Sequence, residues 1–280
     1  MTGPGPITVV GCGIMGSGIA HVARGAGHPV TAVEAGLDDL DPARARVARY
    51  VAQAEKRGDD PSQLADVSFT DDLAAAVAGA ELVIEAVPEE LALKQSVFAT
   101  IGAAASDDAV LASNTSGLSI TALGDAAGRP AQTVGLHFFN PVPSMGLVEV
   151  ARTPDTSDAT FERALAFSRR VGKETVEVND SPGFVTTRLI IVLVCEAIRA
   201  YEAGVATAEN LDAAMRLGFN HPMGPLELAD RVGLDTVLAI ADDLGAAFGA
   251  AFEAPALLRR MVAEGARGRK SGRGFYDYTR

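Results

Sequence analysis

The feature that most constrains the fold is a glycine-rich turn near the amino terminus, in the segment ITVVGCGIMGSGIAHV at residues 7–22. A β-branched run typical of a strand precedes the turn, and a helical pattern follows it. In a GxGxxG turn the first glycine allows the tight bend, the second lets backbone amides approach a pyrophosphate, and the third lets the helix pack on the strand. The helix amino terminus adds partial positive charge. A glycine turn without a ligand is the alternative. The predicted dinucleotide contacts are Gly11, Gly13, Ile14, Met15 and Gly16.

The next expected strand, PVTAVE, ends in Glu34, 23 residues after Gly11. This is close to the spacing of the acidic residue that binds the adenosine ribose in dinucleotide-binding folds. A carboxylate there accepts hydrogen bonds from both ribose hydroxyls and repels a 2′-phosphate. The sequence therefore predicts NAD in preference to NADP, with a solvated glutamate at a strand end as the alternative.

The pattern of strand followed by helix continues through the first two thirds of the chain. Further strands are expected at residues 67–70, 81–88, 109–116, 133–139, 146–152 and 174–178. Helices are expected at residues 41–56, 71–80, 89–105, 119–128 and 159–172. Such alternation is typical of an α/β domain with a doubly wound parallel sheet, which we assign to residues 1–181.

From Gly183 onward the pattern is helical, apart from a possible short strand at GFYDY, residues 274–278. Glycines and prolines separate the expected helices. Residues 182–280 are therefore predicted to form an all-α domain. Its first helix is apolar nearly all round, which is typical of a central helix or of a subunit interface.

Composition excludes several classes of partner. The net charge is −12, so the chain is not expected to bind nucleic acid or an anionic membrane surface. The longest apolar run, LIIVLVC at residues 189–195, is too short to span a bilayer. Cys12 and Cys195 lack the spacing of a metal or redox site. Without a signal-peptide pattern at the start of the chain, we expect a cytoplasmic protein with no metal.

His137 stands in the segment GLHFFNP, at the end of an apolar run. A histidine in such a setting is more often a satisfied core residue than a catalyst. However, polar residues also follow the strands that precede Glu89 and Ser116, and the carboxyl ends of parallel strands form the ligand-binding edge. Glu149 follows 12 residues later, on what is expected to be a neighbouring strand. A carboxylate bonded to an imidazole fixes its tautomer and stabilises its cation, so this pair is predicted to act as an acid–base pair beside NAD.

Taken together, these segments resemble the 3-hydroxyacyl-CoA dehydrogenase family, which includes the bacterial 3-hydroxybutyryl-CoA dehydrogenases. The resemblance covers essentially all 280 residues and is far more specific than the glycine turn alone. It is carried, in order, by GCGIMGSGIA, ELVIEAVPEELALKQSVF, LASNTSGLSIT, GLHFFNPVPSMGLVEV, DSPGF, HPMGPLELAD, VGLDT and GRKSGRGFYDY. The resemblance implies a Rossmann-type NAD domain, an acyl-CoA substrate, and a helical domain that pairs two subunits into a homodimer.

The resemblance also implies roles for single residues. His137 and Glu149 match the catalytic pair, and Ser116 matches a residue near both the nicotinamide and the substrate hydroxyl. Arg57 is the best match for a contact with the CoA phosphates. Cofactor-contacting positions are matched by Glu34, Glu89, Lys94, Ser116, Asn140 and Lys270.

Three positions depart from the family pattern. Gly117 replaces a serine, and Gly146 replaces a common lysine. Thr187 stands where the family usually has an asparagine that faces the substrate carbonyl. Threonine offers a rotatable hydroxyl with shorter reach in place of a planar amide, so this change bears on the substrate more than on the reaction.

The predicted activity is therefore the reversible, NAD-dependent oxidation of a short 3-hydroxyacyl-CoA to the 3-ketoacyl-CoA. Two alternatives stay open at this point. The first is the same chemistry on an acyl-carrier-protein thioester or a free hydroxy acid. The second is an NAD-binding protein that does not catalyse a reaction.

Overall fold

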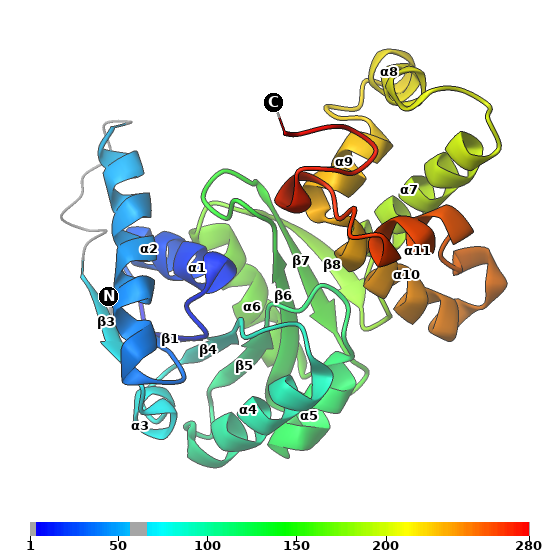
Figure 1. Ribbon diagram of the computed structural model, residues 1–280. Coiled ribbons are helices and arrows are strands. Elements are labelled where there is room, and N and C mark those ends of the chain that lie inside the picture. The colour runs from blue at the N-terminus through cyan, green and yellow to red at the C-terminus, as the bar shows by residue number, and fades with distance from the viewer. Residues whose placement is uncertain (1–3, 57–65, 280) are drawn as a thin grey trace. The chain divides into compact units, whose positions relative to one another are not determined.

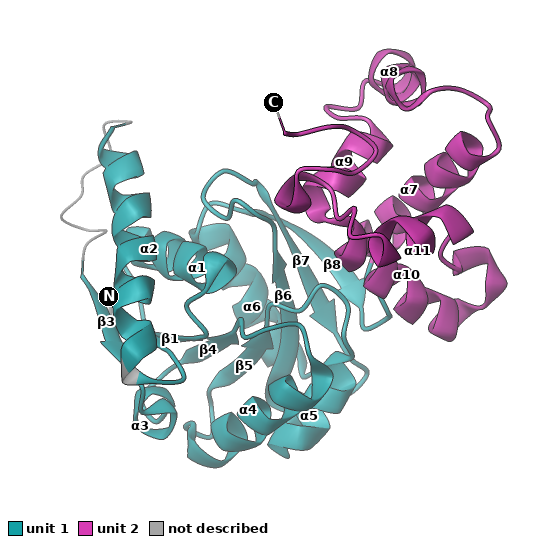
Figure 2. Ribbon diagram, viewed as in Figure 1, with its two compact units in different colours: residues 1–184 teal, residues 185–280 magenta. Residues whose placement is uncertain are grey.

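The computed structural model describes residues 4–56 and 66–279, and the chain divides into two compact units, residues 1–184 and 185–280 (Figure 2). The first unit combines strands and helices, whereas the named elements of the second are all helical (Figure 1). Within the described part of the chain, no helix is long and apolar enough to cross a membrane.

One eight-stranded sheet forms the centre of the first unit, in the order β3-β2-β1-β4-β5-β6-β7-β8. The strands are β1 (Ile7–Val10), β2 (Val30–Val33), β3 (Val67–Thr70), β4 (Leu82–Glu85), β5 (Val110–Ser113), β6 (Thr133–Phe138), β7 (Leu147–Arg152) and β8 (Glu174–Asn179). All neighbours from β3 to β6 pair in parallel. The order reverses between β1 and β4, as in a doubly wound sheet, and this confirms the predicted fold class.

The far edge of the sheet departs from the predicted all-parallel arrangement. β7 pairs with β6 antiparallel and with β8 in parallel, so β7 and β8 run opposite to the other strands. Residues 139–146 between β6 and β7 contain no helix. A parallel neighbour would need a crossover connection of about a dozen residues or more, so a connection this short returns antiparallel. The antiparallel register places His137 directly opposite Glu149.

Helices cover both faces of the sheet (Figure 1). They are α1 (Ile14–Gly25), α2 (Leu37–Glu55), α3 (Leu73–Val77), α4 (Leu91–Ala104), α5 (Ile120–Ala127) and α6 (Asp158–Arg170). Apolar residues of α1 and α6 share one buried cluster with the strands, and those of α3, α4 and α5 share another. The sheet is thus buried on both sides, which explains its continuous β-branched runs.

The boundary between the units lies after Phe184, three residues beyond the predicted end of the first domain at residue 181. The reason is packing. Phe184 is buried in a cluster with Ile120, Ala151 and Val178. The amide of Gly183 also donates to the Gly117 carbonyl at 3.4 Å. Residues 182–184 therefore belong to the core of the first unit.

The second unit consists of helices around one apolar cluster. They are α7 (Thr186–Glu202), α8 (Ala208–Phe219), α9 (Pro225–Val232), α10 (Leu234–Phe248) and α11 (Ala256–Ala263). In α7, Ile191, Val194, Cys195 and Ile198 are buried. Leu189 and Val192 of the same helix are exposed. The helix that appeared apolar all round in the sequence therefore has both a core face and an uncovered face.

The possible strand at residues 274–278 does not form. This tail makes two isolated bridges instead. The buried carboxylate of Asp230 accepts hydrogen bonds from the amides of Phe275 and Tyr276, each at 3.0 Å. The Tyr276 hydroxyl donates to Asp212 at 2.7 Å. Because side-chain carboxylates take the backbone amides that a neighbouring strand would need, the tail packs as an irregular strap.

Candidate active site

The glycine turn between β1 and α1 has the geometry that its sequence predicts. Gly11 has φ +85°, a value that favours glycine. A Cβ on Gly16 would lie 1.8 Å from the Gly11 carbonyl oxygen, so only glycine lets α1 approach the strand this closely. A Cβ on Gly13 would meet nothing within 4 Å. The middle glycine thus faces open space, where a phosphate can approach its backbone.

A cavity of about 770 Å³ opens in front of this turn, at the carboxyl ends of β1, β2, β4 and β5. Its size and position suit a dinucleotide. The predicted cofactor residues that line it are Gly11, Gly13, Ile14, Met15, Glu34, Glu89, Lys94 and Ser116. Gly16 does not line the cavity, because it packs α1 against the backbone of the turn. Arg46 and Asp71 also line the cavity, although the sequence did not single them out.

Glu34 lies at the end of β2 and is held by the glycine turn. The Cys12 amide donates to Glu34 Oε1 at 2.8 Å. Arg46 Nε donates to the Cys12 carbonyl at 3.1 Å, and Arg46 Nη2 is 3.9 Å from Glu34 Oε1. Among the described residues Glu34 Oε2 has no hydrogen-bond partner, so this oxygen can accept further hydrogen bonds, and its predicted contact with the ribose stays a prediction. Helix α2 carries several arginines, and Arg46 is the one of them that lines the cavity. The packing of α2 decides this, and the sequence did not predict that packing.

Lys94 lines the cavity, but its ammonium group is committed to the protein. The side chain is 1% exposed, and Nζ lies 2.8 Å from Glu85 Oε1 and 3.3 Å from Glu89 Oε2. Glu85 is fully buried and also accepts from Ser113 Oγ at 2.7 Å. Burial raises the pKa of Glu85, and the Lys94 ammonium opposes this rise. Lys94 therefore holds the loop after β4 in shape, and its predicted contact with the cofactor stays a prediction.

Glu89 positions the loop that carries Ser116. Its Oε1 accepts from the Thr115 hydroxyl at 2.6 Å and from the Ser116 amide at 2.7 Å. The next residue, Gly117, packs against the Gly183 backbone, where a Cβ would lie 2.4 Å from the Gly183 nitrogen. The departure from the family serine at this position thus coincides with a close backbone contact. A side chain at Gly146 would meet nothing within 4 Å, and nothing in the structure explains that departure.

His137 and Glu149 form a buried hydrogen-bonded pair across β6 and β7. His137 Nδ1 is 2.7 Å from Glu149 Oε2, and the side chains are 7% and 0% exposed. A carboxylate only accepts, so Nδ1 carries the hydrogen and Nε2 of the neutral ring is available as a base. The Phe139 and Phe184 rings lie 4.4 Å and 6.1 Å from the imidazole, centroid to centroid. Asn114, which lines the cofactor cavity, accepts from the amide of Phe138 at 2.9 Å, so the pair lies next to that cavity.

Lys173 supports the turn between these two strands, a role that no sequence pattern indicated. It is 7% exposed, and Nζ donates to the carbonyls of Val142 and Met145, each at 2.7 Å. Burial lowers the pKa of Lys173. The turn includes Asn140, which is exposed and does not line the cavity, so its predicted cofactor contact stays a prediction.

The remaining predicted site residues lie outside the first unit or outside the described residues. Thr187 is half-buried in the first turn of α7. Lys270 forms an ion pair with Asp235, within the second unit. Arg57 lies outside the described residues. The roles of these three residues stay predictions.

Comparisons with known proteins agree with this geometry. The model of the 3-hydroxyacyl-CoA dehydrogenase NAD binding domain matches residues 6–181, and that of the C-terminal domain matches residues 183–278. A probable 3-hydroxybutyryl-CoA dehydrogenase of Bacillus subtilis is 44% identical over 280 residues, covering 97% of this chain and 96% of the relative. One of the same name from Deinococcus radiodurans is 43% identical, covering 96% and 99%. The crystal structure of (S)-3-hydroxybutyryl-CoA dehydrogenase PaaH1 from Ralstonia eutropha matches with a TM-score of 0.94 at 36% identity over the whole of both chains. On this evidence from sequence and fold, the chain belongs to the 3-hydroxyacyl-CoA dehydrogenase family.

Proposed function

We propose that this protein catalyses the reversible, NAD-dependent oxidation of a short 3-hydroxyacyl-CoA, such as 3-hydroxybutyryl-CoA, to the 3-ketoacyl-CoA. His137 is the general acid–base and Glu149 its partner. The observation that carries the proposal is the 2.7 Å contact between His137 Nδ1 and Glu149 Oε2, beside a cavity that fits a dinucleotide. The pair and the cavity lie at the carboxyl ends of the parallel strands, where ligands bind in this fold.

The residues of the glycine turn and Glu34 would hold NAD⁺ in the cavity, where it would supply the hydride acceptor for C3 of the substrate. His137 Nε2 takes the proton of the 3-hydroxyl group, and the fully buried Glu149 carboxylate stabilises the imidazolium that results. Ser116 lines the cavity and its amide donates to Glu89, and we propose that its side chain hydrogen-bonds the same hydroxyl. In the reverse direction the imidazolium returns the proton to the carbonyl oxygen.

The test is a comparison of kcat/KM in the presence of NADH, followed at 340 nm. The panel contains acetoacetyl-CoA, longer 3-ketoacyl-CoAs, the matching acyl-carrier-protein thioesters and free 3-keto acids. We expect a CoA thioester of short chain to give the largest value. A larger kcat/KM for a carrier-protein thioester or a free acid would show that this compound, and not a CoA thioester, is the preferred substrate. No turnover of any compound would leave a protein that binds NAD without catalysis.

Glu34 is expected to make the enzyme prefer NADH over NADPH. A 2′-phosphate placed beside this carboxylate should cost about 1–3 kcal/mol, by analogy with close charge pairs measured by mutation, or about 5- to 150-fold in kcat/KM. Glu34→Ser should remove most of the preference, because Arg46 then lies without the competing carboxylate. Equal kcat/KM for the two cofactors in the wild-type enzyme would contradict the assignment.

Thr187 is expected to tune substrate choice. If the family asparagine binds the substrate carbonyl through its amide, threonine loses a neutral hydrogen bond worth roughly 0.5–1.5 kcal/mol, or about 2- to 13-fold. Thr187→Asn should then raise kcat/KM on acetoacetyl-CoA and lower it on any different natural substrate. If Thr187 only packs the start of α7, the variant should change stability and leave the ratios across the thioester panel unaltered.

The second unit is proposed to form a homodimer. Leu189, Val205, Leu217 and Phe219 are 65%, 72%, 87% and 73% exposed, which is unusual for large apolar side chains in one small unit. Light scattering at micromolar concentration should give twice the chain mass of 28.9 kDa. Leu217→Glu should shift the protein toward the monomer, whereas Thr100→Glu, which adds the same charge on α4, should not. A wild-type monomer would contradict the proposal.

The protein is also proposed to work in the reducing environment of the cytoplasm. Both of its cysteines, Cys12 and Cys195, are buried free thiols. Thiols that take no part in a disulfide are typical of proteins in reducing compartments. Mass measurement of the protein purified under non-reducing conditions should show both cysteines in the thiol form, and a disulfide between chains would count against this setting.

A further inference from the structure

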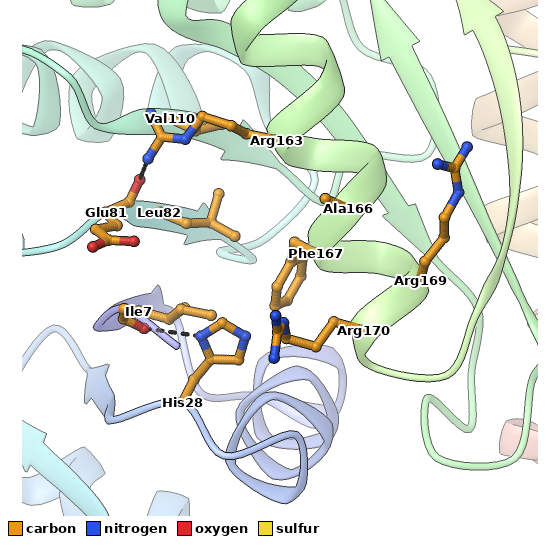
Figure 3. A pocket seen from close by; sticks show the side chains of 11 residues that line it. Ile7, His28, Glu81, Leu82, Val110, Arg163, Ala166, Phe167, Arg169 and Arg170 are labelled. Atoms are coloured by element: carbon orange, nitrogen blue, oxygen red, sulfur yellow. Dashed lines mark hydrogen bonds between the residues drawn. The ribbon is translucent and has the colours of Figure 1, made fainter. Parts of the chain in front are cut away.

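A second cavity, of about 560 Å³, lies at the amino ends of the parallel strands, opposite the ends that face the dinucleotide cavity (Figure 3). Its floor is formed by the first residues of three strands, Ile7, Leu82 and Val110, and one wall is formed by α6. It shares no lining residue with the dinucleotide cavity. Ligands of this fold bind at the carboxyl ends of the strands, so the proposed reaction gives this cavity no role.

The cavity is lined by a buried histidine that lacks a hydrogen-bond partner on one side. His28 is 8% exposed, and its Nδ1 is 2.8 Å from the Gly5 carbonyl oxygen. Because a carbonyl only accepts, Nδ1 carries the hydrogen, and Nε2 of the neutral ring is an acceptor. Nε2 is buried and has no partner among the described residues. Buried polar atoms are nearly always hydrogen-bonded, so this one points to a donor that the described residues do not supply.

The imidazole is held in place from a second direction. The His28 and Phe167 rings meet in an edge-to-face arrangement, with their centroids 5.7 Å apart and an interplanar angle of 68°. Figure 3 shows the second ring nitrogen, Nε2, on the side of the His28 ring away from the dashed hydrogen bond and toward the Arg170 side chain. The acceptor is therefore oriented by the protein before any ligand arrives.

Arg170 supplies an uncommitted positive charge to the same cavity. Arg163 donates to the carbonyls of Asp108 and Glu81, so its guanidinium is already used. Neither Arg169 nor Arg170 has a side-chain hydrogen bond or ion pair within the described part of the chain. In Figure 3 Arg170 extends toward His28, whereas Arg169 extends away from it. Arg170 is exposed, so its side chain can turn toward a ligand without breaking a contact.

We propose that this cavity binds a small organic carboxylate that also carries a hydroxyl group on an apolar body. The carboxylate pairs with Arg170, whose planar guanidinium suits two carboxylate oxygens. The hydroxyl donates to His28 Nε2, and the body packs against the apolar lining that includes Leu82, Val110 and Phe167. One carboxylate, that of Glu81, also lines the cavity and would repel a dianion, so a monocarboxylate fits better than a phosphate.

The test is calorimetric titration of the full-length enzyme with 4-hydroxyphenylacetate, and with phenylacetate as the matched compound without the hydroxyl. We expect one site per chain for 4-hydroxyphenylacetate, with the same Kd when NADH is saturating. Phenylacetate should bind about 2- to 13-fold more weakly, the range for one neutral hydrogen bond. Absence of binding at tens of millimolar, competition with NADH, or tighter binding of inorganic phosphate would each overturn the proposal.

Two arginine variants separate a ligand contact from a structural role. Arg169 and Arg170 both lie in the last turn of α6, where a cation interacts favourably with the helix dipole. Arg170→Gln should weaken 4-hydroxyphenylacetate binding about 10- to 150-fold, the range for a hydrogen bond to a charged group. Arg169→Gln should leave it unchanged. Equal effects of the two variants would overturn the assignment of Arg170.

His28 has its own readouts. His28→Phe keeps a ring against Phe167 and should abolish the difference between the two compounds. Nitrogen-15 NMR gives a measurement that needs no variant, because the chain has only four histidines. Addition of 4-hydroxyphenylacetate should shift the His28 Nε2 resonance, and phenylacetate should not. An Nε2 resonance that does not respond to the bound hydroxy compound would overturn the predicted contact.

Discussion

His137→Gln is expected to lower kcat by about 10²–10⁴-fold, the contribution of a positioned acid–base group. In the native pair, Nδ1 is hydrogen-bonded to Glu149 at 2.7 Å, and Nε2 is the only ring nitrogen left to exchange a proton with substrate. Glutamine has no group that can take up a proton near neutral pH. Binding of NADH should stay nearly intact, because His137 does not line the dinucleotide cavity.

The choice of glutamine matters because Glu149 is fully buried. An alanine at position 137 would remove the imidazole that hydrogen-bonds this buried carboxylate and would destabilise the fold strongly. The glutamine amide can still donate to Glu149, so a loss of activity can be separated from a loss of structure. The measurements are kcat on acetoacetyl-CoA, a fluorescence titration with NADH, and thermal unfolding. A kcat within a few-fold of wild type would show that another group moves the proton.

Glu149→Gln is expected to reduce kcat within the same range of about 10²–10⁴-fold. Two effects act together. The variant removes the negative charge that stabilises the imidazolium in a buried site. Its amide can also donate to Nδ1, which moves the ring hydrogen to Nε2 and leaves the wrong tautomer to accept a proton. A matched control is Glu177→Gln on the neighbouring strand β8, where the side chain is exposed; this variant should keep full activity.

The double variant of His137 and Glu149 tests whether the two residues act as one unit. Residues that work through one another are strongly non-additive. If Glu149 acts only through His137, the double variant should be no slower than His137→Gln alone. A double variant slowed by the product of the two single factors would show that Glu149 has an independent role.

The sequence alone was sufficient where local chemistry decides the structure. Gly11 and Gly16 could be placed in a strand–turn–helix unit because their φ angle or their close packing excludes a side chain. The β-branched runs predicted the strands of the sheet, since both of its faces are covered by helices. His137 and Glu149 could be paired because a short connection between two expected strands makes those strands neighbours.

Other features depend on which distant segments meet, and the sequence does not carry that information locally. The reversal of β7 and β8, the direction of Arg46 toward Glu34, and the support of the turn by Lys173 all arise from packing. The tail at residues 274–278 fails to form a strand because a distant carboxylate captures its amides.

The cavity beside His28 shows the same division most clearly. The sequence showed a histidine, three strand starts and an adjacent pair of arginines, in segments far apart along the chain and with no pattern to join them. The parallel sheet brings the starts of β1, β4 and β5 to one edge, and α6 closes over them. Local residue chemistry therefore determined the family, the glycine turn and the pairing of His137 with Glu149. Tertiary packing alone decided which charged and polar groups face each other, because those contacts join residues that are many positions apart in the chain.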